Sequence, residues 1–226
     1  MRLRERIALP DETIPVRPAA PDPRGHRAVG VSRRERLGAE GNEILTSATA
    51  AVLVVLLAAE GITIIRMGGL VGVHMFIGLL LIPPALLKIA STGYRFVRYY
   101  SGARAYREKG PPLLGLRLLA PVLVVSTVAV LATGVWLLAL GHRSNQVLQL
   151  HQIAFIVFGV VFAIHFLAYA PRMVRSLRAD WSPIRRQAIP GTGLRGMLVA
   201  ASFGAGLALS LSLLSAIEGW HGGHFG

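Results

Sequence analysis

Apolar residues fall into five long segments that are separated by short polar stretches. The segments are apolar on every face, so periodicity cannot assign their secondary structure, but their length and the absence of regularly spaced turns favour helix. About 20 helical residues cross the hydrocarbon core of a bilayer, and each segment is long enough. We therefore predict an all-α integral membrane protein with five transmembrane helices. They cover residues 44–66, 69–93, 113–140, 146–170 and 194–217.

The polar stretches divide the rest of the chain. Residues 1–43 are rich in Arg and Pro, which predicts a mostly disordered cytoplasmic arm, with a short interfacial helix at 32–43. Residues 171–193 are expected to form a basic cytoplasmic loop, and 218–226 an outer tail. The tail histidines His221 and His224 either pick up a metal ion or are simply solvated, and the lack of further nearby ligands favours the second interpretation. The arm contains no apolar core followed by a small-residue cleavage site, so we expect the first helix to act as its own insertion signal.

Charge refines the topology. The 226 residues carry a formal net charge of +13. The cations concentrate before the first segment and in the loops after the second and fourth, which predicts a cytoplasmic N-terminus and an outer C-terminus in the inner (plasma) membrane. Topology and attraction to anionic lipid account for this charge better than nucleic acid, which would require a soluble domain. The chain has no cysteine, which excludes disulfides and thiolate metal ligands.

Three histidines and one lysine lie inside the apolar segments. Ionisable groups at membrane depth are costly and usually mark a functional site. His151 and His165 are 14 residues apart in the fourth segment, and His74 and Lys88 repeat this interval in the second. Fourteen helical residues return to within roughly 40° of the same face and rise about 21 Å. Since the second and fourth segments run in the same direction, His74 is predicted level with His151, and Lys88 with His165.

Small residues recur at the same interval on the two intervening segments. Ser47 and Gly61 are 14 apart in the first segment, and Ala120 and Gly134 are 14 apart in the third. Small side chains let a flat macrocycle approach the helix backbone. Gly134 is the more discriminating of these residues, because the first segment is rich in Ala and Ser throughout.

This pattern resembles the dihaem four-helix core of membrane b-type cytochromes, namely cytochrome b of quinol–cytochrome c reductases and the cytochrome b subunits of formate dehydrogenases and hydrogenases. In the first group, two parallel helices each carry His-x13-His and the other two carry pairs of small residues. The resemblance covers residues 44–170 and implies two haems b. It implies that His74 and His151 ligate the outer haem and that His165 ligates the inner one. Lys88 stands where the family has histidine.

Three interpretations of Lys88 are open. It coordinates the inner iron as a neutral amine, or it extends toward the cytoplasmic surface and pairs with a haem propionate, or there is no inner haem. Pro83 and Pro84 each remove a helical hydrogen bond and predict a kink between the two ligand levels, either to position Lys88 or as an ordinary membrane kink.

Other charged residues are candidates for supporting roles. Arg66 and Arg143 at the outer level, and Arg95 and Arg98 at the inner level, are placed either to neutralise haem propionates or to set topology. Glu60 is the only acidic residue well inside a predicted helix. It is either a proton relay at an outer quinone site, or a protonated or rim-exposed side chain without a functional role.

The expected function follows from these residues. We expect a membrane subunit that carries electrons across the bilayer between two haems, to or from a quinone or the other redox subunits of a complex. It would be part of a larger oxidoreductase and not a complete enzyme. The alternatives are a transporter subunit, in which a broken second helix binds an anionic substrate, and a cofactor-free membrane anchor.

Overall fold

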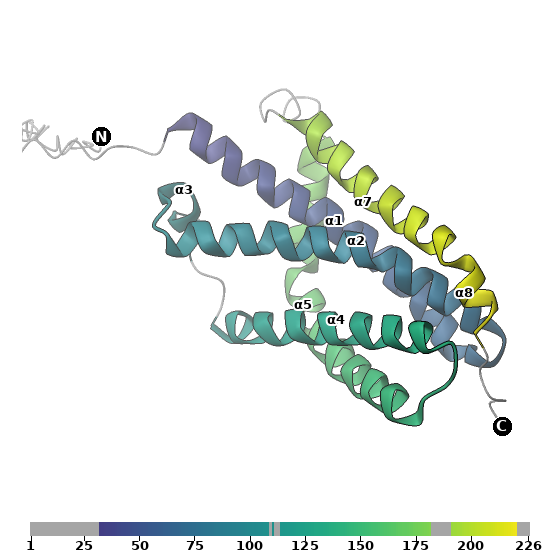
Figure 1. Ribbon diagram of the computed structural model, residues 1–226. Coiled ribbons are helices and arrows are strands. Elements are labelled where there is room, and N and C mark those ends of the chain that lie inside the picture. The colour runs from purple at the N-terminus through teal and green to yellow at the C-terminus, as the bar shows by residue number, and fades with distance from the viewer. Residues whose placement is uncertain (1–31, 109, 111–113, 182–190, 221–226) are drawn as a thin grey trace, which may run out of the picture. The chain divides into compact units, whose positions relative to one another are not determined.

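The computed structural model describes residues 32–108, 110, 114–181 and 191–220. Within this part the chain is mostly helical and contains no strand, and five of its helices are long and apolar enough to cross a membrane. The prediction of an all-α, multi-pass membrane protein is therefore confirmed. Residues 1–31 of the predicted arm at 1–43, and the end of the outer tail at 221–226, lie outside the described residues. Figure 1 shows the arrangement of α1 (Arg33–Ile65), α2 (Met67–Tyr100), α3 (Arg104–Arg107), α4 (Leu114–Leu140), α5 (Asn145–Trp181), α7 (Thr192–Ser212) and α8 (Leu214–Glu218).

Several helices extend further than hydropathy predicts. The expected interfacial helix at 32–43 is the first part of α1, α2 continues past residue 93 to Tyr100, and α5 continues through Pro171 to Trp181. The predicted polar loop at 171–193 therefore begins as helix. The reason is that hydropathy detects only the part of a helix that lies at membrane depth, whereas the backbone hydrogen-bond ladder continues into the polar interface.

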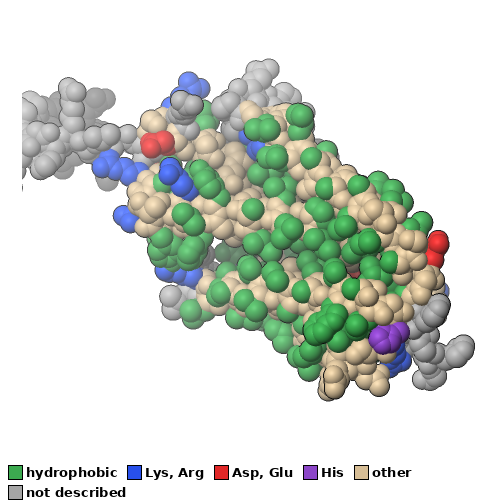
Figure 2. Space-filling view, in the orientation of Figure 1, with side chains coloured by type: hydrophobic (Ala, Val, Ile, Leu, Met, Phe, Trp, Pro, Cys, Tyr) green, Lys and Arg blue, Asp and Glu red, His purple; other side chains and the backbone are tan. Residues whose placement is uncertain are grey.

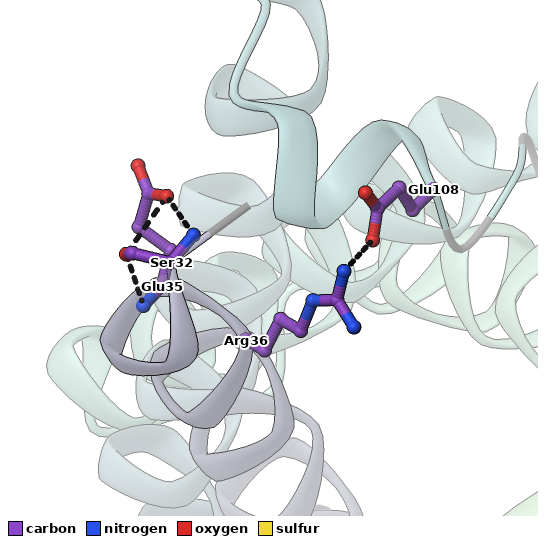
Figure 3. Close-up of polar contacts among 4 residues, drawn as sticks. All are labelled: Ser32, Glu35, Arg36 and Glu108. Carbon is purple, nitrogen blue, oxygen red and sulfur yellow. Dashed lines mark hydrogen bonds and ion pairs between the residues drawn. The ribbon is translucent and has the colours of Figure 1, made fainter. Parts of the chain in front are cut away.

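A capping box starts α1. Ser32 Oγ accepts a hydrogen bond from the backbone N–H of Glu35 at 3.3 Å, and the backbone N–H of Ser32 donates to Glu35 Oε2 at 3.1 Å (Figure 3). The two bonds satisfy N–H groups that the first turn of a helix leaves unpaired. Beside the box, an ion pair of 3.8 Å between Arg36 and Glu108 connects α1 to the end of α3 (Figure 3).

Two antiparallel hairpins build the bundle. One consists of α1 and α2, joined at Arg66, and the other of α4 and α5, joined by a turn whose Gly141 has a φ of +67°. The hairpins meet where α1 contacts α5 and α2 contacts α4. Helix α7 packs against α2 and α1, outside this group of four (Figure 1). The prediction of a four-helix bundle with a peripheral fifth helix agrees with this packing.

Pro83 and Pro84 lie inside α2 without interrupting it. The one non-helical residue within α2 is Leu70, with φ −123° and ψ 18°, so the predicted kink does not appear as a break at the prolines. Because Pro84 has no N–H, the carbonyl of Leu80 lacks its helical partner. The backbone of α7 approaches this carbonyl so closely at Gly206 that a Cβ there would collide with the Leu80 oxygen. The prolines therefore mark the surface of α2 on which α7 packs.

Large apolar side chains cover the outside of the helices, as Figure 2 shows for one face. Examples are Leu167, Val55 and Leu118, which are 74%, 68% and 67% exposed. A contiguous apolar exterior of this extent fits contact with lipid. Most of the Lys and Arg side chains visible in Figure 2 gather at the end where α1 begins and α3 lies. The protein is thus polar and cationic at one end and apolar along its length.

Candidate cofactor site

A cavity of about 1490 Å³ runs between the four bundle helices, and no described residue of α7 lines it. Ligand pockets for a single drug-sized molecule are typically about 300–1,000 Å³, so this space is large enough for more than one. Its walls are mainly apolar. Of the predicted site residues, those that line it are His74, His151, His165, Lys88, Gly134, Ser47, Ala120, Arg95, Arg143 and Glu60.

Three predicted residues lie elsewhere. Gly61, Arg66 and Arg98 do not line the cavity, and Arg98 lines a separate small pocket with Glu35 and Tyr106. At the end of the cavity that contains His74 and His151, α1 instead presents Leu57, Glu60 and Ile64. The 14-residue interval from Ser47 selected Gly61, but the face of α1 that meets the cavity passes through Glu60. The expected role of Gly61 in accommodating a macrocycle therefore has no support from its position.

The structure brings His74 and His151 together across the cavity. Their ring centres are 6.3 Å apart, and the ring planes are at 89° to each other. Two imidazoles that bind one metal ion from opposite sides, through bonds of about 2.0–2.1 Å, have ring centres roughly 6 Å apart. The separation in the structure therefore fits a metal ion held between the two rings.

Threonine hydroxyls fix the tautomer of both histidines. Thr133 Oγ1 donates to the carbonyl of Ala129 at 2.7 Å, and it lies 3.0 Å from Nδ1 of His151. Since the hydroxyl proton is used by the carbonyl, Oγ1 accepts a hydrogen bond from Nδ1–H. The proton therefore resides on Nδ1, and Nε2 of His151 carries the lone pair that a metal would bind.

His74 is held in the same manner by the other hairpin. Thr63 Oγ1 donates to the carbonyl of Glu60 at 2.6 Å and lies 3.0 Å from Nδ1 of His74. The carboxylate oxygen Oε1 of Glu60 also lies 3.0 Å from this Nδ1. Partners of this kind orient metal-binding histidines in many proteins. The contact places Glu60 behind His74, so its position favours orienting the ring over acting at a separate quinone site.

Gly134 lies directly against the ring of His151. A Cβ at this position would be 3.2 Å from Cε1 and 3.7 Å from Nδ1 of the imidazole. The small residue predicted to admit a macrocycle therefore also makes room for the ligand ring itself. It is next to Thr133, so adjacent residues of α4 set both the space and the hydrogen bond of His151.

The other end of the cavity, predicted as the inner level and lined by Lys88 and His165, has a different chemistry. Lys88 Nζ donates to the carbonyl of Thr46 on α1 at 2.9 Å. Ser91 on α2 accepts a hydrogen bond from Thr46 Oγ1 at 3.2 Å, which is a second polar contact between α1 and α2. Across the cavity, the ring of His165 stacks on Tyr169 at 5.7 Å, and its Nδ1 is buried without a hydrogen-bond partner among the described residues.

Aromatic side chains line the α5 wall between the two levels. Phe158 and Phe162 stack at 5.5 Å, and Phe162 and Phe166 stack at 5.8 Å. The walls contributed by α1, α2 and α4 between the levels consist mainly of aliphatic and small residues. The cavity thus offers a flat, apolar surface on one side, which suits contact with a planar apolar group.

The sequence did not identify Thr63 and Thr133 as site residues, nor the stacked Phe158, Phe162 and Phe166. The sequence contains a signal for the threonines, because each is a hydroxyl residue near the outer end of its helix, within two positions of a glycine that the spacing had selected. The Phe residues follow His151 at helical intervals, but in an apolar helix the sequence does not show which face meets the cavity.

The fold and cavity define the class of protein as a multi-pass, all-α membrane protein with a ligand-sized space inside its four-helix bundle. Comparison with protein-family models, with curated proteins and with solved structures gives no match. Among the described residues, no group of three or more His, Cys, Asp or Glu side chains is placed to hold a metal ion. Haem iron needs only two axial ligands from the protein, because the macrocycle supplies the others.

Proposed function

We propose that the protein is a b-type cytochrome, a membrane subunit that holds two haems b and carries electrons between them across the bilayer. The observation that carries this proposal is the His74–His151 pair, with ring centres 6.3 Å apart and both Nδ1 atoms bound to threonine hydroxyls. An ordinary interhelical hydrogen bond between the two rings would not require both Nε2 atoms to be left available.

The residues of the outer site have distinct roles in this proposal. His74 and His151 would hold the iron through Nε2, and Thr63, Glu60 and Thr133 keep the rings oriented. When bound, haem would supply a one-electron couple between ferric and ferrous iron. The mainly apolar walls would limit the access of water to this site.

Arginines at both ends of the cavity support the same proposal. Arg143 lines the outer end and Arg95 the inner end. A guanidinium group at each end can neutralise the propionates of a haem through charge-assisted hydrogen bonds. Arg66, which was expected to share this role, does not line the cavity.

The membrane, orientation and partners belong to the same proposal. In the cell inner (plasma) membrane, the cationic end, where α1 begins and α3 lies, would face the cytoplasm, and the α8 end would lie outside. The exposed apolar exterior supports contact with lipid. In this proposal electrons would be exchanged with a quinone or with another redox subunit.

The test is optical and uses the full chain purified in detergent. We expect two haems per polypeptide by pyridine haemochrome and a reduced α-band split between the two sites. His151→Ala should remove the outer haem and leave one per chain. His142→Ala is the matched control, because His142 is a nearby exposed histidine that does not line the cavity. A folded protein without haem would contradict the proposal and favour a membrane anchor or transporter subunit.

A further inference from the structure

The inner end of the cavity poses a question about Lys88 that rests on the proposed function. Its Nζ bonds to the carbonyl of Thr46 at 2.9 Å. It forms no ion pair with a carboxylate among the described residues. Lys88 also lines the cavity, whose walls are mainly apolar.

Counting donors distinguishes the two forms of the amine. An ammonium group has three N–H donors and no lone pair, whereas a neutral amine has two N–H donors and one lone pair. With one acceptor at Thr46, an ammonium would retain two unsatisfied donors next to an apolar cavity, which is energetically costly. A neutral amine would retain one donor and a lone pair, which a metal ion can bind.

His165 supplies the second half of the argument. It lines the same cavity, and its Nδ1 is buried and lacks a partner among the described residues. Lys88 on α2 and His165 on α5 thus line one cavity, and the imidazole has a polar atom that no described protein group satisfies. At the outer level the equivalent ring nitrogens are already bound by Thr63 and Thr133, so the two levels differ in their supporting contacts.

We infer that Lys88, as a neutral amine, and His165 are the two residues that would hold the iron of the inner haem. The hydrogen bond from Nζ to Thr46 orients the amine, as the threonine hydroxyls orient the outer imidazoles. An amine donates only through its lone pair, whereas imidazole also has a π system. The inner haem would therefore differ spectroscopically from the bis-histidine outer haem.

Electron paramagnetic resonance of the oxidised full-length protein tests this ligation. We expect two different low-spin signals in equal amounts, together with two haems per chain by pyridine haemochrome. Lys88→Ala should convert the inner signal to high spin, and added propylamine should restore low spin by occupying the vacated position. Lys88→His should restore low spin with a signal like that of the outer haem.

Controls separate this inference from the proposed function. His74→Ala should remove the outer signal and leave the inner one. A wild-type inner signal that is high spin, or that Lys88→Ala leaves unchanged, would overturn the assignment of Lys88 while the cytochrome proposal stands. A single haem per chain that is retained in His165→Ala would also overturn the assignment of Lys88 and His165 as ligands, while the cytochrome proposal stands. A folded protein with no haem would overturn both.

Discussion

The hydroxyl of Thr133 lies 3.0 Å from Nδ1 of His151, and Thr63 stands in the same relation to His74 in the other hairpin. The two hairpins thus make the same contact where His74 and His151 face each other: a threonine on the first helix orients a histidine on the second.

Thr133→Val removes the hydrogen-bond acceptor of His151 while keeping the shape of the side chain. Loss of such a supporting partner typically weakens metal binding about 10–100-fold. We expect outer haem to be lost during purification or titration, which pyridine haemochrome and the amplitude of the bis-histidine EPR signal will measure. Thr49→Val is the matched control, because Thr49 Oγ1 donates to the carbonyl of Leu45 at 2.8 Å and the residue does not line the cavity. Equal haem loss in both variants would contradict the role of Thr133.

Gly134→Ala places a methyl group 3.2 Å from Cε1 of His151, a contact tighter than most Cβ atoms make. The imidazole must move by a few tenths of an ångström, away from the position in which it faces His74. We expect a shifted outer-haem EPR signal and lower haem content, with little change in helicity by circular dichroism. Gly115→Ala, in the same helix and with open space at its Cβ, should leave both measurements unchanged.

Gly206→Ala tests the packing of α7 on α2. The added methyl collides with the backbone oxygen of Leu80, which cannot move away without distorting α2 at its prolines. Overpacking of this kind costs about 1–3 kcal/mol, and we expect a lower thermal-unfolding midpoint in detergent. Gly204→Ala, two positions away with open space, should have a much smaller effect. Haem content at low temperature should not change in either variant, since α7 does not line the cavity.

Ser32→Ala and Arg36→Ala should differ in their effect on stability, although both residues lie in the first turns of α1. The capping box is lost in Ser32→Ala, which typically costs about 0.5–2 kcal/mol. Arg36→Ala removes an ion pair whose side chains are 59% and 52% exposed, and such pairs contribute about 0–1 kcal/mol. Thermal unfolding at low and high salt will separate the two, because only the Arg36 effect should diminish as salt rises. A larger loss of stability in Arg36→Ala than in Ser32→Ala would contradict the conclusion that the capping box contributes more than the ion pair.

The sequence predicted those site residues that can be recognised by their position within an apolar segment. Histidines and a lysine in apolar segments are visible without a structure, because few ionisable residues are tolerated there. The 14-residue interval placed Gly134 on the cavity but misplaced Gly61, since a small error in helical phase moves a residue to a neighbouring face. The contacts of Thr63 and Thr133 could not be predicted, because they depend on how two helices rotate against each other.

The sequence by itself determined five membrane-spanning helices, since the length and hydropathy of each segment alone satisfy the requirements of a bilayer. It also determined which ionisable residues lie among them. Only the tertiary structure decided that His74 and His151 face each other at 6.3 Å, that Lys88 bonds to Thr46, and that α7 packs on the proline-containing surface of α2. The physical reason is that hydropathy acts on each helix separately, whereas facing side chains and freed carbonyls depend on the rotation and depth at which helices pack against one another.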